Sequence, residues 1–150
     1  MDLAEVLRSA GLLDQQKLDM ARQAQADGQR LDEAAVELGL ITEEQALRAI
    51  GESVGLPFID LAESEIDLSL LASVPASLIH HELIFPIRQQ NGSLVVATAN
   101  PFSLYALDEL SATLGKPIQS VLAPRSEIAK LIKTHLGVGS QTVDRLVAQS

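Results

Sequence analysis

Apolar residues in the first fifty positions recur at the three- and four-residue spacing of amphipathic helices, and this pattern occurs twice. The stretch LAEVLRSAGLLDQQKLDMA, residues 3–21, returns 28 positions later as LDEAAVELGLITEEQALRA, residues 31–49. Repetition at a fixed period is typical of a duplicated structural unit. The pattern therefore predicts two helix-turn-helix units that bury their apolar faces against each other in a small four-helix layer.

Each repeat carries signals for the ends of its helices. Gly11 and Gly39 stand where a helix commonly ends with a residue in the left-handed conformation. Asp14 in the first copy has the character of a helix N-cap, and Thr42 with Gln45 three residues later has the pattern of a capping box. We therefore expect a break at each glycine and a new helix after each cap.

The repeated pattern does not continue into the rest of the chain. The segment LPFIDL, residues 56–61, is predicted to be extended because Pro57 disfavours helical geometry in the residue before it. We place a domain boundary here, with a helical repeat subdomain at residues 1–60 and an α/β subdomain at residues 61–137. Residues 138–150 are expected to form a linker or tail that leads towards a further domain.

Two runs of strand-forming residues, 83–89 and 93–99, follow in the second half of the chain. The Asn91-Gly92 pair between them is a strong hairpin signal, because both residues tolerate the positive φ angles of a tight primed turn. Pro86 cannot donate a hydrogen bond to a neighbouring strand, so we expect its strand at the edge of the sheet.

A helix is predicted after Asn100 and Pro101, then a third strand at residues 117–122 and a last helix from Pro124. The resulting order β-β-α-β-α predicts an α+β fold, in which the repeat layer precedes a small sandwich with a three-stranded sheet. If the third strand lies parallel to the second, both helices are expected to cover the same face of that sheet.

Composition limits the classes of function. The chain is 47% hydrophobic but only 3% aromatic, which argues against the base-stacking platforms of single-strand nucleic-acid binders. The net charge is −9, and residues 1–60 carry 12 acidic and 5 basic residues, so the repeat half repels phosphate backbones and favours a basic protein partner. With no cysteine and no cationic or long apolar leader, we expect a cytoplasmic protein that binds no nucleic acid.

The candidate motifs for catalysis and metal binding lack the residues or the spacing that their chemistry requires. Gly115-Lys116 is followed by Pro117 and lacks the upstream glycine of a phosphate-binding loop, which makes Lys116 a surface residue. His80 and His81 are adjacent and diverge by one helical step, so they do not have zinc-ligand spacing. The sequence therefore predicts no catalytic residue, no metal site and no enzyme activity in this chain.

The second half nevertheless contains a specific string of segments: LPFIDL, then Val74-Pro75, FPIRQQNGSLVVATANPFSLYALDEL at residues 85–110, and VLAPRSEIAKLI at residues 121–132. Together with the repeats, this string resembles the N-terminal domain of the ATPases that drive type II secretion and type IV pilus assembly. The resemblance covers nearly the whole chain.

This resemblance implies a non-catalytic docking and regulatory domain that binds the cytoplasmic part of an inner-membrane platform protein. It also implies a hexameric parent and a cytoplasmic location that reaches the membrane only through the partner. ATP and Mg²⁺ would bind in a separate motor core, and this chain would carry no cofactor.

By resemblance, the docking face is expected around the hairpin and the following helix, with Arg88, Gln90 and Tyr105 as contacts. Arg88 and Gln90 are equally explained as the solvent side of a strand, and Tyr105 as a half-buried ring.

The alternative is a sensor for cyclic di-GMP, because some members of the repeat family bind this ligand through an Arg-Leu-Gly opening, leucines and a terminal glutamine in each copy. Here the openings read Asp2-Leu3-Ala4 and Arg30-Leu31-Asp32, and Ser53 replaces the second terminal glutamine. The matching residues are Leu3, Gly11, Leu12, Leu18 and Gln25 in the first copy and Arg30, Leu31, Gly39, Leu40 and Gln45 in the second. Asp2 stands in place of the first arginine and Asp32 in place of the second glycine, and both contribute anions that repel a dianionic ligand. We therefore favour a degenerate scaffold with Arg30 as its best remaining cation.

Overall fold

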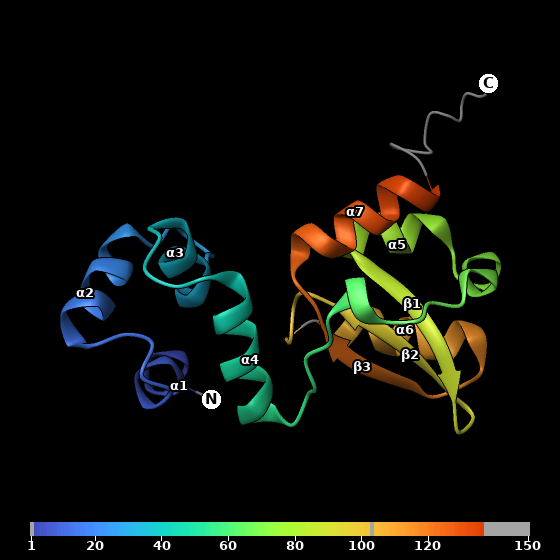
Figure 1. The fold of residues 1–150 in the computed structure, drawn as a ribbon, viewed down its shortest axis with the longest axis horizontal. Helices are drawn as coiled ribbons and strands as arrows, with labels where there is room; N and C mark the ends of the chain where they lie inside the picture. Colours follow the sequence, from blue (N-terminus) through green and yellow to red (C-terminus); the bar gives the residue numbers. More distant parts are fainter. Residues whose placement is uncertain (1, 103, 137–150) are drawn as a thin grey trace. The chain divides into compact units, whose positions relative to one another are not determined.

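The computed structural model describes residues 2–102 and 104–136, which fall into two compact units (Figure 1). The N-terminal unit ends at Phe58 and the C-terminal unit begins at Ile59, two residues before the boundary predicted from the sequence. Each unit has its own hydrophobic core and is described by itself. No helix in the described ranges is both long and apolar enough to cross a bilayer.

The N-terminal unit consists of two helix-turn-helix repeats, as the sequence predicts. The first repeat is α1 (Leu3–Ser9) with α2 (Gln15–Ala24), and the second is α3 (Leu31–Glu37) with α4 (Glu43–Val54). Helix α1 packs on α3 and α4, and α2 packs on α3, so the repeats share one core. Buried residues from all four helices contribute to it, including Leu7, Leu18, Ala35 and Ala46.

The predicted helix signals take the expected roles. Gly11 and Gly39 both have a φ angle of +76° immediately after their helices end. The Asp14 carboxylate accepts a hydrogen bond of 2.8 Å from the Lys17 backbone N–H. Thr42 and Gln45 form both bonds of a capping box, at 3.1 and 3.0 Å. The repeat structure is therefore encoded in local interactions.

The C-terminal unit contains the predicted β-β-α-β-α order, which confirms the α+β fold class. Its sheet has the order β1-β2-β3, with β1 antiparallel and β3 parallel to β2. The elements are the 3₁₀ turns η1 (Leu61–Glu63) and η2 (Leu68–Ser73), then α5 (Ala76–Glu82), β1 (Ile84–Gln90), β2 (Ser93–Thr98), α6 (Leu104–Leu114), β3 (Ile118–Leu122) and α7 (Arg125–Leu136).

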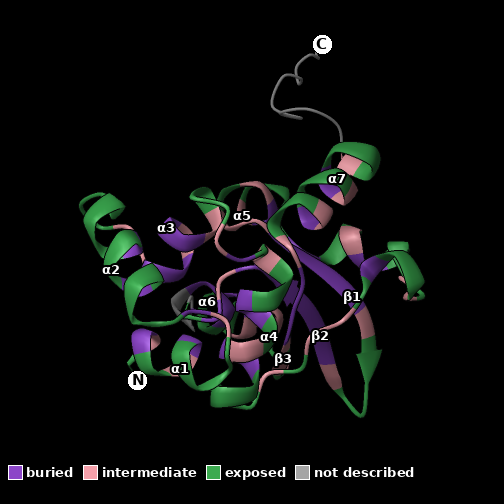
Figure 2. Cartoon of the chain, turned by 60° about the vertical axis from the view of Figure 1, so that its left-hand side comes forward, coloured by how far each residue is buried: buried purple, intermediate pink, exposed green. Residues whose placement is uncertain are grey.

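Both faces of the sheet are covered, because β2 is buried at every position from Leu94 to Thr98 (Figure 2). On one face, the Phe85 ring of β1 lies 6.3 Å, centroid to centroid, from the His135 ring of α7. Ala97 of β2 pairs with Phe85, so the two side chains lie on the same face of the sheet. Side chains alternate between faces along a strand, so the Val96 side chain lies on the opposite face. Val96 is nevertheless fully buried.

Helix α6, which packs on β3, supplies this second cover, and Figure 1 shows α6 and α7 on different sides of the strands. The expectation that both helices cover one face is therefore wrong. The crossover rule constrains only the helix between two parallel strands, whereas α7 follows β3 and returns on the other side. The nearly continuous apolar run of β2 is typical of a strand buried on both faces.

Strand β1 is an edge strand, as expected from Pro86. Pro86 lies opposite Val96, and the pairing shifts by one residue between Pro86 and Arg88, which marks a β-bulge. The outer side of the bulged strand is partly covered, because the Asp67 backbone N–H at the start of η2 donates a 2.8 Å hydrogen bond to the Ile87 carbonyl.

The hairpin between β1 and β2 turns at Asn91 and Gly92, whose φ angles are +53° and +79°.

A Cβ added at Gly92 would meet no atom within 4 Å, so Gly92→Ala tests backbone conformation alone. We expect the substitution to lower the free energy of unfolding by about 1–2 kcal/mol, because a side chain disfavours the left-handed conformation. Urea denaturation measures the change. The control Gln89→Ala, at an exposed position in the same hairpin, should stay within about 0.5 kcal/mol of the wild type, and equal effects would contradict the explanation.

Candidate functional site

Arg30, the best remaining cation for the alternative cyclic di-GMP site, forms an ion pair with an acidic residue of its own repeat. Its Nε donates to Asp32 Oδ1 at 3.0 Å and its Nη2 donates to Asp32 Oδ2 at 3.1 Å. Asp32 is only 3% exposed and lies in the first turn of α3, where the helix dipole favours a negative charge. Asp32 thus engages N–H donors of the Arg30 guanidinium that a ligand phosphate would otherwise use.

The predicted leucines serve the hydrophobic core. Leu18 and Leu31 are buried, and Leu3, Leu12 and Leu40 pack against them as partly buried residues. Packing alone therefore accounts for all five positions.

The predicted glutamines and glycines also take part in local structure. Gln45 belongs to the capping box of α4, and Gln25 follows the end of α2, where its side-chain amide donates to the Gln29 carbonyl. Gly11 and Gly39 end the first helix of each repeat. The cyclic di-GMP site therefore remains a prediction, carried by residues that each have a structural role as well.

A hollow of about 500 Å³ does lie between α1 and α4, but no residue predicted for the ligand lines it. It is lined by Val6, Ala10 and Ala49, the hydroxyl residues Ser9 and Ser53, and the acids Asp2, Glu5 and Glu52. Hydrogen bonds from the side chains of Arg8 and then Ser9, together with the positive charge of Arg8, lower the pKa of Glu5. This carboxylate therefore stays ionised at neutral pH, and the hollow disfavours a phosphate group.

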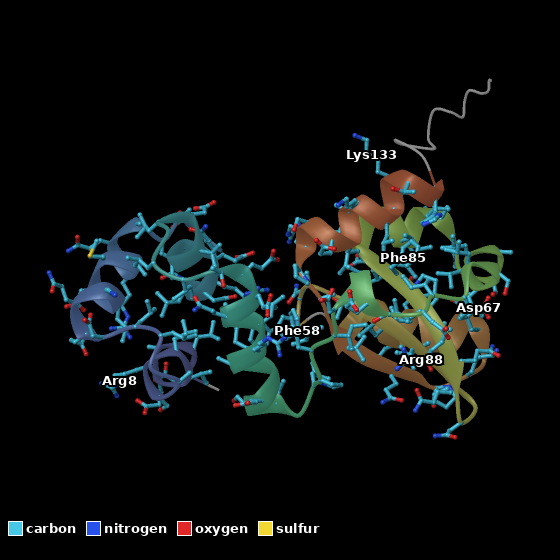
Figure 3. The ribbon with its side chains drawn as sticks, viewed as in Figure 1. Arg8, Phe58, Asp67, Phe85, Arg88 and Lys133 are labelled. Carbon is cyan, nitrogen blue, oxygen red and sulfur yellow. The ribbon has the colours of Figure 1, made fainter. Side chains whose placement is uncertain are left out.

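The residues predicted for docking are brought together only in part. Arg88 and Gln90 lie near the hairpin end of β1, and the Arg88 Nε donates a 3.1 Å hydrogen bond to Gln90 Oε1 (Arg88 is marked in Figure 3). Gln90 is exposed and Arg88 is half-buried. Tyr105 belongs to α6, and its side chain lies outside the described residues.

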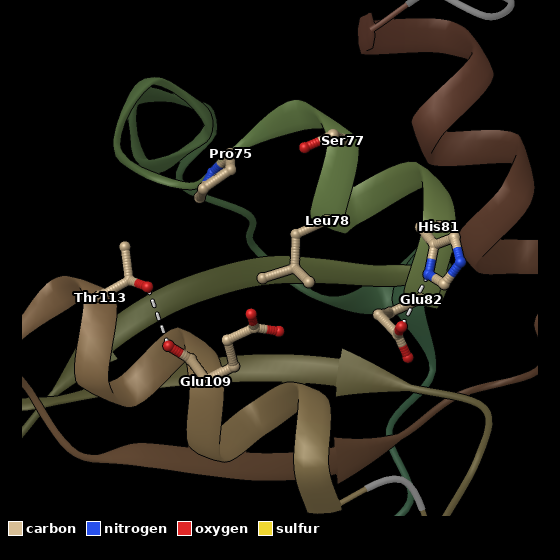
Figure 4. Close-up of a pocket in the computed structure, with 7 residues that line it drawn as sticks. All are labelled: Pro75, Ser77, Leu78, His81, Glu82, Glu109 and Thr113. Atoms are coloured by element: carbon tan, nitrogen blue, oxygen red, sulfur yellow. Dashed lines mark hydrogen bonds and ion pairs between the residues drawn. The ribbon is translucent and has the colours of Figure 1, made fainter.

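A second surface, which we name the α5–α6 groove, was not singled out by the sequence. It is an open groove with a volume of about 530 Å³. It is lined by Pro75, Ser77, Leu78, His81 and Glu82, from α5 and the residue before it, and by Glu109 and Thr113 of α6 (Figure 4). In this view the Glu109 carboxylate points towards Leu78. The only sequence signal is the spacing of Leu78 with Glu82 and of Glu109 with Thr113, because residues four apart share one face of a helix.

Two of the five polar residues that line this groove, Glu82 and Glu109, are acidic. The Glu82 carboxylate lies 2.8 Å from His81 Nδ1, and the Glu82 side chain is 25% exposed whereas that of His81 is 83% exposed. Thr113 donates its hydroxyl to the Glu109 backbone carbonyl at 2.9 Å. No lysine or arginine stands among the described residues that line the groove. The groove therefore presents two carboxylates beside an apolar floor.

Comparison with known proteins points to one family. The family profile of the MshEN domain matches residues 54–142. The pilus assembly ATPase PilB of Myxococcus xanthus is 26% identical over 146 residues, which are 97% of this chain and 26% of PilB. The type II secretion system protein E of Xanthomonas campestris is 28% identical over 150 residues, with the same two coverages.

A further relative has a different kind of name. The bacteriophage adsorption protein B of Escherichia coli is 28% identical over 126 residues, which are 84% of this chain and 17% of that protein. The chain thus spans about a quarter or less of the length of these relatives.

Solved structures share the fold. A structure described as MshE with cdg has a TM-score of 0.79 and 24% identity, covering 90% of this chain and 99% of the other. The N-terminal domain of XpsE has a TM-score of 0.67 and 25% identity, covering 87% of this chain and 91% of the other. The match is therefore to N-terminal regions of secretion and pilus ATPases.

Proposed function

The chain belongs to the MshEN domain family, and we propose that it is a non-catalytic docking and regulatory domain at the N-terminus of a type II secretion or type IV pilus ATPase. The observation that carries this proposal is the family match over residues 54–142, supported by two ATPase relatives that match along 97% of the chain. ATP and Mg²⁺ bind in a separate motor core of the parent, which is hexameric, and this domain holds no cofactor.

The partner is the cytoplasmic part of the inner-membrane platform protein of the same machine. A chain with a net charge of −9 attracts a basic surface, and both the α1–α4 hollow and the α5–α6 groove carry carboxylates beside apolar side chains. In the described ranges no three histidine, aspartate or glutamate side chains are placed to hold a metal ion. We propose that the domain works by recognition in the cytoplasm and meets the membrane through its partner.

A co-purification assay tests the proposal. The tagged domain is mixed with the cytoplasmic region of the platform protein and recovered on resin, with the fold monitored by circular dichroism. Retention of the partner in a saturable, stoichiometric ratio supports docking. Loss of the partner in washes while the domain keeps its helical spectrum contradicts it.

A second candidate function is binding of cyclic di-GMP, which the fold match to MshE with cdg favours. The Arg30–Asp32 pair argues against it, because it places a buried carboxylate beside the cation that would meet a dianion. The α1–α4 hollow offers no alternative site for a dianion, because acidic residues line it. We infer that the domain has the fold of such a sensor but does not bind cyclic di-GMP.

Calorimetric titration with cyclic di-GMP is expected to give no saturable heat up to about 100 µM ligand. The variant Arg30→Lys is the informative comparison, because lysine keeps the charge beside Asp32 but loses the planar two-bond geometry. Micromolar affinity in the wild type that disappears in Arg30→Lys, with an unchanged melting temperature, would establish the sensor function instead.

A further inference from the structure

We propose that the α5–α6 groove is the docking site for a partner segment that presents a lysine or arginine side chain next to an apolar one. The inference rests on the docking function proposed above and assigns its contact surface. The groove lies entirely within the residues matched by the family profile. It is separate from Arg88 and Gln90, which lie near the hairpin end of β1.

The shape of the groove suits side chains of a partner. Its volume of about 530 Å³ is within the range of specific ligand pockets, about 300–1,000 Å³. Leu78 is half-buried and projects between the two helices, and exposed Pro75 extends the apolar surface (Figure 4). An apolar side chain that covers Leu78 and Pro75 would remove this surface from water, which is the main favourable term in most protein association.

The negative charge of the groove favours a partner segment in which a lysine or arginine lies next to the apolar side chain. Glu82 and Glu109 line the groove from two different helices. A carboxylate has several hydrogen-bond acceptor sites, so Glu82 can accept a further bond besides its contact with His81. The Glu109 carboxylate has no hydrogen-bond or ion-pair partner among the described residues. Because Glu82 is three-quarters covered, an ion pair formed there is less screened than one on an open surface.

The groove is also held in place before a partner arrives. Ile79 anchors α5 in the core and Leu110 anchors α6, and both residues are fully buried. The two carboxylates thus stand on helices that need not be reordered on binding, which lowers the entropic cost of association. The α1–α4 hollow is a weaker candidate because two of its carboxylates already have partners: Asp2 caps α1 and Glu5 pairs with Arg8.

Titration of the platform protein's cytoplasmic region into three forms of the whole domain tests the inference. The forms are the wild type, the groove variant Glu82→Gln/Glu109→Gln, and the control Glu5→Gln/Glu52→Gln, which removes the same charge from the α1–α4 hollow. We expect the groove variant to bind about tenfold more weakly and the control to change affinity less than about twofold.

A second variant adds a positive charge and bulk to the groove. Thr113→Lys places a cation in the groove at an exposed helix position and should weaken binding by more than about tenfold, with an unchanged melting temperature. Wild-type affinity in both groove variants would overturn the groove assignment while docking itself stands. Absence of binding by the folded wild type would contradict docking and this inference together.

The other possible occupant is a second copy of this chain. Sedimentation velocity of the wild type alone is expected to show a monomer. A dimer that Thr113→Lys dissociates would show that the groove serves self-association, and would overturn the assignment to a partner segment.

Discussion

Phe85→Ala is expected to lower the free energy of unfolding of the C-terminal unit by about 3–5 kcal/mol, the usual cost of truncating a buried phenylalanine. Phe85 is fully buried on β1, its ring lies against His135 of α7, and it belongs to the core that joins the sheet to both α6 and α7 (Figure 3). Removing the ring leaves a cavity beneath α7 that the surrounding sheet and helices cannot fill without shifting.

Urea denaturation followed by far-ultraviolet circular dichroism measures this effect. Phe102→Ala is the matched control, because Phe102 is 41% exposed and its truncation should cost less than about 1 kcal/mol. Similar destabilisation by the two variants would mean that Phe85 does not hold the sheet and α7 together as described.

Arg30→Ala is expected to destabilise the N-terminal unit by about 3 kcal/mol, since removing one partner of a buried ion pair leaves the other charge uncompensated. Asp32 is nearly inaccessible to water, whereas the Arg30 side chain is 23% exposed, so the orphaned carboxylate carries most of the cost. The double variant Arg30→Ala/Asp32→Ala should regain part of the lost stability, because the buried charge is then gone.

The same measurement on Arg8→Ala provides the comparison. Arg8 pairs with Glu5, and both side chains are more than half exposed, so this variant should change the free energy of unfolding by less than about 1 kcal/mol. Equal effects of Arg8→Ala and Arg30→Ala would contradict a structural role for the Arg30–Asp32 pair. They would also remove the main physical reason for doubting cyclic di-GMP binding.

Much of the fold could be predicted because its determinants are local. Gly39, Thr42 and Gln45 specify where one helix ends and the next begins, and Asn91-Gly92 specifies the hairpin, through bonds and dihedral angles within a few residues. The face covered by α7 could not be inferred in this way. It depends on how the chain returns after β3, which no local pattern encodes.

The candidate sites show the same division. The opposing charges of Arg30 and Asp32 are visible in the sequence, but their two hydrogen bonds depend on the geometry at the start of α3. The α5–α6 groove is harder to foresee, because Glu82 and Glu109 are distant along the chain and line one groove only when α5 and α6 pack around the sheet. A surface built by tertiary contacts leaves little trace in a single sequence.

The most direct test of the docking role is a calorimetric titration of the folded wild-type domain with the cytoplasmic region of its platform protein. We predict saturable binding to one site per domain, with a dissociation constant of about 10 µM or tighter. Absence of any saturable heat at partner concentrations up to about 100 µM, with both proteins folded, would contradict the proposed function.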